Sequence, residues 1–224
     1  MKMKSILKMK YFNNVGVMFC MIVMCSCNST AQKPTTPAAA PQQIPAPQGR
    51  AIAVFAEGCF WCSEHIFEAV AGVDSAVSGY SGGKTVNPTY EQVCSETTGH
   101  AEAVMVYYNP KEVSYGELVK VFFSSQDPTT PNQQGPDRGS SYRSIAFYQN
   151  NEQRETIQKE IDVVNKSKRF RNEVVTEVLP FEKFYRAEEY HQDYIEHHPE
   201  NGYVQNVSLP RFKLFTETYK GKLK

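Results

Sequence analysis

Cysteine and surplus charge are scarce in this sequence, and each shortage excludes a class of protein. Only three of the six cysteines, Cys59, Cys62 and Cys94, lie beyond residue 27, and so small and odd a number does not build a disulfide scaffold. Basic and acidic residues balance at 24 each, and no basic stripe is present to hold nucleic acid. A second CxxC and an HExxH motif are also missing, so the sequence predicts no metal site.

The first 26 residues have the composition of an export signal. Four lysines, at positions 2, 4, 8 and 10, precede an apolar run from Val15 to Met24, which is too short for a permanent membrane-spanning helix. The run ends in Met24-Cys25-Ser26-Cys27. This ending resembles a bacterial lipoprotein box, in which Cys27 is acylated and becomes the mature N-terminus. An ordinary signal peptide cut nearby and an uncleaved N-terminal anchor are the alternatives.

The segment after the signal has the composition of a flexible tether. From Asn28 to Gly49 the chain is rich in proline, alanine, glutamine, serine and threonine and almost uncharged, so it cannot bury enough apolar surface to offset its chain entropy. We therefore expect a lipoprotein signal peptide over 1–26, a lipid-anchored linker over 27–49 and one folded domain over 50–224. The protein is expected to be exported and anchored to the membrane of a bacterial cell envelope, on its periplasmic or surface side.

Apolar periodicity in the folded part predicts strands alternating with helices. The predicted strands cover 51–56, 102–108, 144–148 and 173–179, and the predicted helices cover 59–71, 115–123, 150–166 and 187–196. Residues 79–83 and 125–141 read as loops, and the last thirty residues as irregular, with a final helix possible over 212–219. This order favours a mixed α/β or α+β domain built on βαβ units.

The strongest chemical signal is Gly58-Cys59-Phe60-Trp61-Cys62, where the first strand turns into the first helix. Unpaired N–H groups and the helix dipole at that point favour a thiolate, the nucleophilic form of cysteine. Cys62, one helical turn on, can attack an oxidised Cys59 and close a disulfide. Two buried structural residues, a structural disulfide or half a zinc site are the alternatives. Phe60 and Trp61 can form an apolar box for an S-methyl group or belong to the core.

A second constellation, Gly99-His100-Ala101-Glu102, leads into an apolar strand. Burial of Glu102 would raise its pKa and make it a proton donor, whereas an exposed strand-end carboxylate is the common alternative. A CxxC after a strand also fits a thioredoxin-like thiol-disulfide oxidoreductase. A lipoprotein binding module with structural cysteines is a third possibility.

Five motifs occur in one order along the chain and together identify a family. They are Gly58-Cys59-Phe60-Trp61, Gly79-Tyr80-Ser81-Gly82-Gly83, Asn87-Pro88-Thr89-Tyr90, Gly99-His100-Ala101-Glu102 and Asp137-Arg138-Gly139-Ser140-Ser141-Tyr142-Arg143-Ser144. From Ala51 to Pro210 the chain closely resembles peptide methionine sulfoxide reductase of the A type. The expected fold is an α+β two-layer sandwich, with a mixed central sheet built on βαβ units in a ferredoxin-like core and a long irregular C-terminal segment.

The resemblance implies reduction of the S-epimer of methionine sulfoxide, free or in proteins, without a metal or bound organic cofactor. Cys59 matches the nucleophile that attacks the sulfoxide sulfur, and Glu102 matches the acid that protonates the sulfoxide oxygen. The product on the enzyme would be a sulfenic acid on Cys59. The remaining expected substrate contacts are Phe60 and Trp61 around the methyl group, Tyr90 and Tyr142 on the oxygen, and Asp137 beside the substrate.

The sequence departs from part of the family at Cys62, where many members have glycine and recycle through C-terminal cysteines. No cysteine follows Cys94 here, so we expect Cys62 to resolve the sulfenic acid and a thioredoxin-like donor to reduce the Cys59–Cys62 disulfide. Cys94 is interpreted as an inert, buried thiol. The chain is expected to be a monomer.

Overall fold

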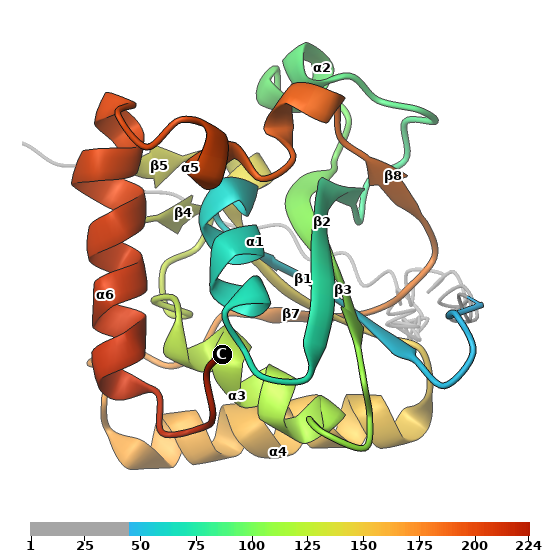
Figure 1. Ribbon diagram of the computed structural model, residues 1–224, viewed down its shortest axis with the longest axis vertical. Coiled ribbons are helices and arrows are strands. Elements are labelled where there is room, and N and C mark those ends of the chain that lie inside the picture. Colours follow the sequence, from blue (N-terminus) through green and yellow to red (C-terminus); the bar gives the residue numbers. More distant parts are fainter. Residues whose placement is uncertain (1–44) are drawn as a thin grey trace, which may run out of the picture. The chain divides into compact units, whose positions relative to one another are not determined.

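The computed structural model describes residues 45–224 (Figure 1). The expected signal peptide, the Cys27 acylation site and most of the linker lie outside the described residues. The strands are β1 (Ala51–Glu57), β2 (Val73–Ser81), β3 (Ala101–Tyr108), β4 (Gln133–Gln134), β5 (Asp137–Arg138), β6 (Ser144–Tyr148), β7 (Glu177–Pro180) and β8 (Phe184–Arg186). The α-helices are α1 (Phe60–Glu68), α2 (Tyr90–Cys94), α3 (Tyr115–Ser124), α4 (Asn151–Ser167), α5 (Tyr194–His197) and α6 (Leu209–Thr218). Short 3-10 turns, η1 (Ser140–Tyr142) and η2 (Glu189–His191), and one π-helical turn, η3 (Val204–Ser208), complete the elements.

The main sheet has six strands in the order β7-β6-β1-β3-β2-β8. Its four central strands pair antiparallel, with β3 inserted between β1 and β2. Helix α1 connects β1 to β2 and α3 follows β3, which is the split βαβ arrangement of a ferredoxin-like core. Strand β7 adds a parallel pair at one edge and β8 an antiparallel pair at the other. The predicted α+β class with a mixed central sheet is therefore confirmed.

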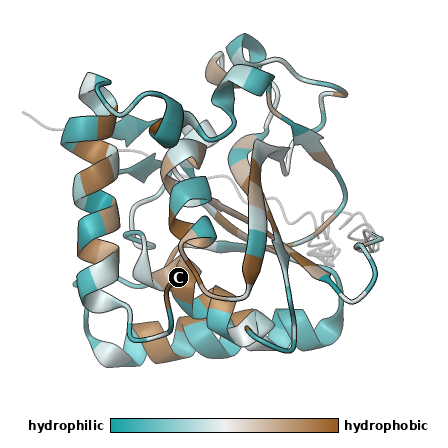
Figure 2. Ribbon diagram, in the orientation of Figure 1, coloured by the Kyte–Doolittle hydropathy of each residue, from teal (hydrophilic) through white to brown (hydrophobic). Residues whose placement is uncertain are grey.

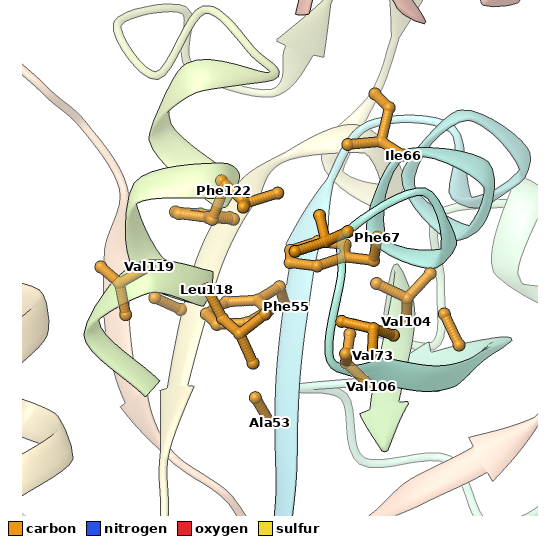
Figure 3. Close-up of a cluster of buried hydrophobic side chains, with 14 of the residues drawn as sticks. Ala53, Phe55, Ile66, Phe67, Val73, Val104, Val106, Leu118, Val119 and Phe122 are labelled. Carbon is orange, nitrogen blue, oxygen red and sulfur yellow. The ribbon is translucent and has the colours of Figure 1, made fainter. Parts of the chain in front are cut away.

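The core lies mainly between the sheet and its helices, as Figure 3 shows. Phe55 of β1 is stacked between Phe67 of α1 and Phe122 of α3, with ring centroids 5.2 and 5.1 Å away. The opposite face of β1 carries Ile52 and Val54, which pack in a second, smaller apolar cluster. Burial of both faces explains why this strand reads as a continuous apolar run.

Helix α4 shows how an amphipathic pattern was read correctly from the sequence. Its only fully buried side chains are Ile157 and Ile161, and most of its ribbon is hydrophilic in Figure 2. Asn150 caps its N-terminus by accepting a hydrogen bond from the N–H of Gln153. Among the described residues, no helix combines the length and apolar character needed to cross a membrane.

Several predicted elements were wrong. Residues 79–81 close strand β2 rather than forming a loop, and the strand carries buried serines such as Ser78, which obscure its apolar pattern. The predicted helix over 187–196 is two short turns, η2 and α5, and the predicted strand over 173–179 is confined to 177–180. Helix α2 was missed. The C-terminal segment is more regular than expected, because η3 and α6 follow each other directly.

Candidate functional site

Cys59 lies between β1 and α1, at the N-cap of the helix. The turn into the helix requires a positive φ of 93° at Gly58, and a Cβ there would collide with the Gln134 side chain, so glycine is needed. The Cys59 side chain is 6% exposed. The sequence therefore placed this thiol correctly, at the junction of the first strand and the first helix.

Glu102 is the second residue of β3 and is 2% exposed. Strand β3 pairs antiparallel with β1, with Phe55 opposite Val104, so the start of β3 lies beside the end of β1 and the residues that follow it. Strand alternation puts Glu102 on the same face as Val104, the helix face. There its Oε2 accepts a hydrogen bond of 3.0 Å from the N–H of Phe60. The exposed strand-end alternative is excluded.

A single cavity brings the two chemical groups together. It measures about 330 Å³ and is lined by Cys59, Phe60, Trp61, Tyr90, Glu102, Asp137, Tyr142, Asn201 and Tyr203. Seven of these nine residues were predicted as site residues from the sequence. The lining combines aromatic surface with hydroxyl and carboxyl groups, which suits a small molecule that has both an apolar and a hydrogen-bonding end.

The aromatic wall is fixed by residues that the sequence did not single out. Trp61 stacks on Tyr194 at a centroid distance of 3.7 Å and donates its indole N–H to Nδ1 of His191 over 3.1 Å. His191 also contacts the ring of Phe60, at 4.9 Å between centroids. Phe60 is fully buried, so it belongs to the core and to the cavity wall at once.

Two further cavity residues, Asn201 and Tyr203, come from the segment that was read as irregular. The Tyr203 hydroxyl donates a hydrogen bond of 2.5 Å to Asp137 Oδ2, and its interaction with Cys59 favours the thiolate of that cysteine. Nothing in the local sequence pattern signals these roles, because they depend on how the C-terminal segment folds back over α1.

Cys62 does not line this cavity. It lies on a second, larger cavity of about 600 Å³, whose walls include Arg211, Gln134 and Pro136. Asp137 and Tyr203 line both cavities. Cys62 is 2% exposed, and its thiol donates a hydrogen bond of 3.2 Å to Ser208 Oγ. The two cysteines of the motif therefore open onto different spaces.

An ion pair missed by the sequence reading lies beside Cys62. Arg211 Nη2 contacts Glu57 Oε1 at 2.9 Å, with the Glu57 side chain wholly buried. Burial raises the pKa of Glu57 to about 7, although the Arg211 charge and the Ser125 hydroxyl lower it. Glu57 ends β1, and Arg211 belongs to α6.

Burial also acts on the carboxyl group of the first cavity. It raises the pKa of Glu102 to about 8, and the Phe60 N–H offsets this only in part. The group therefore holds its proton at neutral pH, as a proton donor must.

The pKa values of the Cys59 and Cys62 thiols are shifted in opposite directions. Burial raises the pKa of the Cys59 thiol well above its usual value, and contact with Cys62 raises it further. A hydrogen bond with Cys59 lowers the pKa of Cys62 to about 6, against the effect of burial and with help from Arg211 and Ser208. The N–H of Phe60, which was expected to favour a thiolate at Cys59, is bonded to Glu102 instead, and burial favours the neutral Cys59 thiol.

Cys59, Cys62 and Cys94 are all free thiols, so the structure contains no Cys59–Cys62 disulfide. Cys94 is exposed at the end of α2, where it was expected to be buried. Within residues 45–224, no group of three or more histidine, cysteine and acidic side chains is arranged to hold a metal ion.

The fold and the cavity together define a thiol-dependent oxidoreductase, in which a buried cysteine and a protonated carboxyl group face one small, partly aromatic space. The family model described as peptide methionine sulfoxide reductase matches residues 51–223. The chain belongs to the peptide methionine sulfoxide reductase family, which confirms the resemblance seen in its motifs.

Individual relatives agree with the family model. A peptide methionine sulfoxide reductase MsrA 1 of Rhodopirellula baltica is 48% identical over 176 residues, covering 79% of this chain and 91% of the relative. The MsrA of Methanosarcina acetivorans is 49% identical over 166 residues, covering 74% of this chain and 86% of the relative. Among solved structures, reduced Mxr1 of Saccharomyces cerevisiae has a TM-score of 0.64 at 32% identity, covering 73% of this chain and 93% of that one. Methionine sulfoxide reductase A of Corynebacterium diphtheriae has a TM-score of 0.62 at 28% identity, covering 75% and 87%.

Proposed function

We propose that this chain reduces methionine-S-sulfoxide, free or within proteins, to methionine, with Cys59 as nucleophile and Glu102 as acid. The observation that carries the proposal is the shared cavity, which holds the Cys59 thiol and the buried Glu102 carboxyl among aromatic and hydroxyl groups. The family relationship supports the reaction type. The epimer rests on the family alone.

In the first step the oxygen atom moves from the substrate sulfur to the Cys59 sulfur. Glu102 gives its proton to the sulfoxide oxygen while Cys59 attacks, and the thiol proton of Cys59 returns to the carboxylate. The products are methionine and a sulfenic acid on Cys59. Hydroxyls of Tyr90 and Tyr142, which line the cavity, are donors for the oxygen as it gains negative charge, so they stabilise the transition state more than the substrate.

The aromatic wall recognises the other end of the substrate. Phe60 and Trp61 form an apolar surface for the S-methyl group. The Trp61 indole is held by both the Tyr194 ring and the His191 ring nitrogen, so this surface is already formed before substrate binds. Preformed recognition surfaces lose little conformational entropy on binding.

In the second step the Cys62 sulfur attacks the sulfenic sulfur of Cys59, expels water and forms the Cys59–Cys62 disulfide. The two positions lie within one turn of the start of α1. A dithiol donor of the thioredoxin type then supplies two electrons by thiol–disulfide exchange and restores both thiols. The Tyr203 hydroxyl, bonded to Asp137, is a positioning group for Cys59 in this cycle.

The test is a reduction assay with a methionine-S-sulfoxide peptide and dithiothreitol. Cys59→Ser should abolish turnover. Cys62→Ser should release one methionine per enzyme in the absence of added thiol but lose thioredoxin-coupled cycling. Cys94→Ser is the matched control and should cycle like the natural chain, because Cys94 lies outside both cavities and serine keeps a hydrogen-bonding group beside Tyr90.

Two outcomes would overturn parts of this scheme. Turnover by Cys59→Ser would remove the nucleophile, and full thioredoxin-coupled cycling by Cys62→Ser would assign resolution to Cys94 or to direct reduction of the sulfenic acid. The R-epimer of the same peptide, run in parallel, tests the epimer assignment.

The family relationship and the antiparallel order of the central strands favour this function over a thioredoxin-like exchanger.

We propose in addition that the protein is exported as a lipoprotein and works as a monomer tethered to a membrane. The support is the basic and apolar composition of residues 1–26, the Ser26-Cys27 ending and the polar linker that follows. Metabolic labelling with a fatty-acid probe should mark the natural chain and not Cys27→Ala. Equal labelling of both would exclude Cys27 as the acylated residue.

A further inference from the structure

The resolving cysteine has surroundings of its own, separate from the substrate cavity. Cys62 lines the larger cavity with Arg211, whereas neither residue lines the cavity of Cys59 and Glu102. The side chains that favour the first step therefore differ from those that can favour the second.

Arg211 is held rigidly at this place. Its Nε donates to the carbonyl oxygen of Ser125 over 2.7 Å, and its Nη2 donates to Glu57 over 2.9 Å. The guanidinium side chain is 13% exposed, so its charge is poorly screened by solvent. A fixed, partly desolvated cation beside a thiol stabilises the anionic form of that thiol.

The turn before α6 brings the second partner of Cys62. The π-helical turn η3 ends at Ser208, whose Oγ lies 3.2 Å from the Cys62 sulfur. A hydroxyl can accept the thiol proton in the resting protein and donate to the sulfur once the thiol has ionised. Ser208 and Arg211 stand one turn apart in the chain, so η3 and α6 present both groups to Cys62.

Several other titratable groups interact with Cys62, and their charges oppose one another. Arg211 is the cation and lowers the pKa of Cys62, as do the hydrogen bonds from Cys59 and Ser208. Four groups oppose the ionisation of Cys62 when they carry negative charge. They are Glu57 at the end of β1, Glu102 on β3, Asp137 on β5 and Tyr203 just before η3. Glu102 and Tyr203 are neutral near pH 7, so the negative charges that oppose the effect of Arg211 on the pKa of Cys62 are mainly those of Glu57 and Asp137.

We propose that Arg211, anchored by Glu57 and Ser125 and assisted by Ser208, is a positioning residue for the second step, holding the Cys62 sulfur as an anion directed at Cys59. The inference rests on the proposed function. In that step the Cys62 anion forms the S–S bond, the sulfenic S–O bond breaks, and the departing hydroxide takes a proton to leave as water.

The test separates the two steps in single turnovers without external thiol. Methionine released per enzyme reports the first step, and loss of free thiols after acid quenching reports the second, measured from pH 5 to pH 9. In the natural chain the second step should rise with pH as the Cys62 thiol ionises, and Arg211 and Ser208 lower the pH at which it does so. Arg211→Met should move the midpoint upward by about one unit, because the thiolate then lacks its cation.

The rate at a fixed pH is the weaker readout. A one-unit rise in thiol pKa lowers the thiolate population at the natural midpoint about fivefold, but the more basic thiolate is about threefold more nucleophilic. The shift of the midpoint avoids this compensation. Arg211→Lys should restore part of the natural midpoint, since it keeps the charge and loses the forked geometry.

Glu57→Gln gives the sharpest control, because it keeps an acceptor for Arg211 and removes the opposing charge. Its midpoint should move downward, opposite to Arg211→Met but by a smaller amount, because Glu57 with a pKa of about 7 is only partly ionised in this range; a general loss of packing cannot produce this opposite shift. Arg169→Gln is the matched control on the same cavity. Arg169 donates to the carbonyl oxygens of Phe123 and Ser124 and lies over the Phe170 ring, so the midpoint of this variant should stay at the natural value.

The outcomes distinguish this inference from the proposed function. If no variant releases methionine, the natural chain included, the proposed function fails. If methionine is released but the midpoint is the same in Arg211→Met, Glu57→Gln and the natural chain, the role of Arg211 is overturned.

Discussion

At the scale of single residues, the site holds Cys59 and Glu102 in their protonated forms, while the environment of Cys62 favours its anion. Glu102 and Cys59 are neutral in the resting protein, since burial raises the pKa of each. The pKa of Cys62, in contrast, is lowered, and this thiol borders a different cavity. Cys59 and Glu102 therefore meet the sulfoxide as uncharged groups, which suits a substrate that carries no net charge and becomes negative at its oxygen only during the reaction.

The pH dependence of the first step follows from Glu102. Its carboxyl group is protonated below about pH 8 and loses the proton above it, so the first-turnover rate should fall as pH rises through 8. Glu102→Gln should lower that rate by about 10²-fold or more at pH 7, because an amide cannot give up a proton. Rapid-quench measurement of methionine checks both; an unchanged rate in Glu102→Gln would contradict the assignment of the acid.

The Glu102 carboxyl group should also make the folding stability depend on pH. Its pKa is raised from 4.5 to about 8 by folding, so it lowers the stability of the folded state progressively as pH rises from 4.5 to 8. Glu102→Gln does not titrate and should gain stability relative to the natural chain over that range. Urea unfolding at pH 5 and pH 8 measures the difference, and a constant difference would argue against a buried, titrating Glu102.

The hydroxyl group of Tyr203 should contribute to the first step. Tyr203→Phe keeps the ring on the cavity but removes the hydroxyl that bonds Asp137 and favours the Cys59 thiolate. The first step should slow several-fold, with little change in thermal stability. Single-turnover kinetics and a melting curve check it, and a normal first step would limit Tyr203 to a structural role.

At the scale of elements, the site depends on a long-range clamp between the first half of the chain and η2. Glu188, just before η2, accepts hydrogen bonds from the Tyr80 hydroxyl of β2 and from the N–H of Tyr90 at the start of α2. Glu188 is half-buried where it makes these bonds, whereas its neighbour Glu189 is exposed.

The clamp can be tested with neighbouring residues. Glu188→Ala should raise the KM for the sulfoxide peptide several-fold, because Tyr90 is no longer anchored. Glu189→Ala should behave like the natural chain, since Glu189 is exposed and pairs only with Arg186 among the ion pairs of residues 45–224. Steady-state kinetics of the two variants provide the comparison, and equal KM values would leave the clamp without function.

Gly79 sets the close approach of β8 to β2. A Cβ at this position would collide with the carbonyl oxygen of Tyr185 and with the Phe184 ring. Gly79→Ala should therefore push β8 away, lower the unfolding temperature and slow turnover, because β8 leads into the segment that carries Glu188 and His191. Thermal melting and activity should fall together; a fully stable, active variant would show that β8 can shift freely.

The same elements show what could be predicted from sequence. Strands buried on both faces, such as β1, and the amphipathic helix α4 carry strong local patterns and were predicted within one or two residues. Strand β2 was missed because buried serines such as Ser78 break its apolar pattern, and the Ser78 N–H is bonded to the side chains of Glu64 and Gln192. Such bonds join residues far apart in sequence, so no local pattern reveals them.

The residues of the candidate site also divide into those that the sequence predicted and those that it did not. Cys59, Glu102, Tyr90 and Tyr142 lie in family motifs and were found. Tyr203, Ser208 and Arg211 were not, because their roles follow from the packing of η3 and α6 against α1 rather than from spacing.

At the scale of the whole molecule, every residue that lines the two cavities lies within residues 45–224. The chain without residues 1–44 should therefore fold and reduce the sulfoxide peptide at the rate of the full chain. Parallel assays of the two forms check this, and a large loss of turnover would mean that the N-terminal segment contributes to the site.

The central claim is that the oxygen of the sulfoxide passes to the sulfur at position 59. Cys62→Ser should be mixed with a methionine-S-sulfoxide peptide without added thiol, and a sulfenic-acid probe should then be located by mass spectrometry. The account predicts one methionine per enzyme and one probe adduct, on Cys59. An adduct on Cys94, or methionine released with no adduct on Cys59, would contradict it.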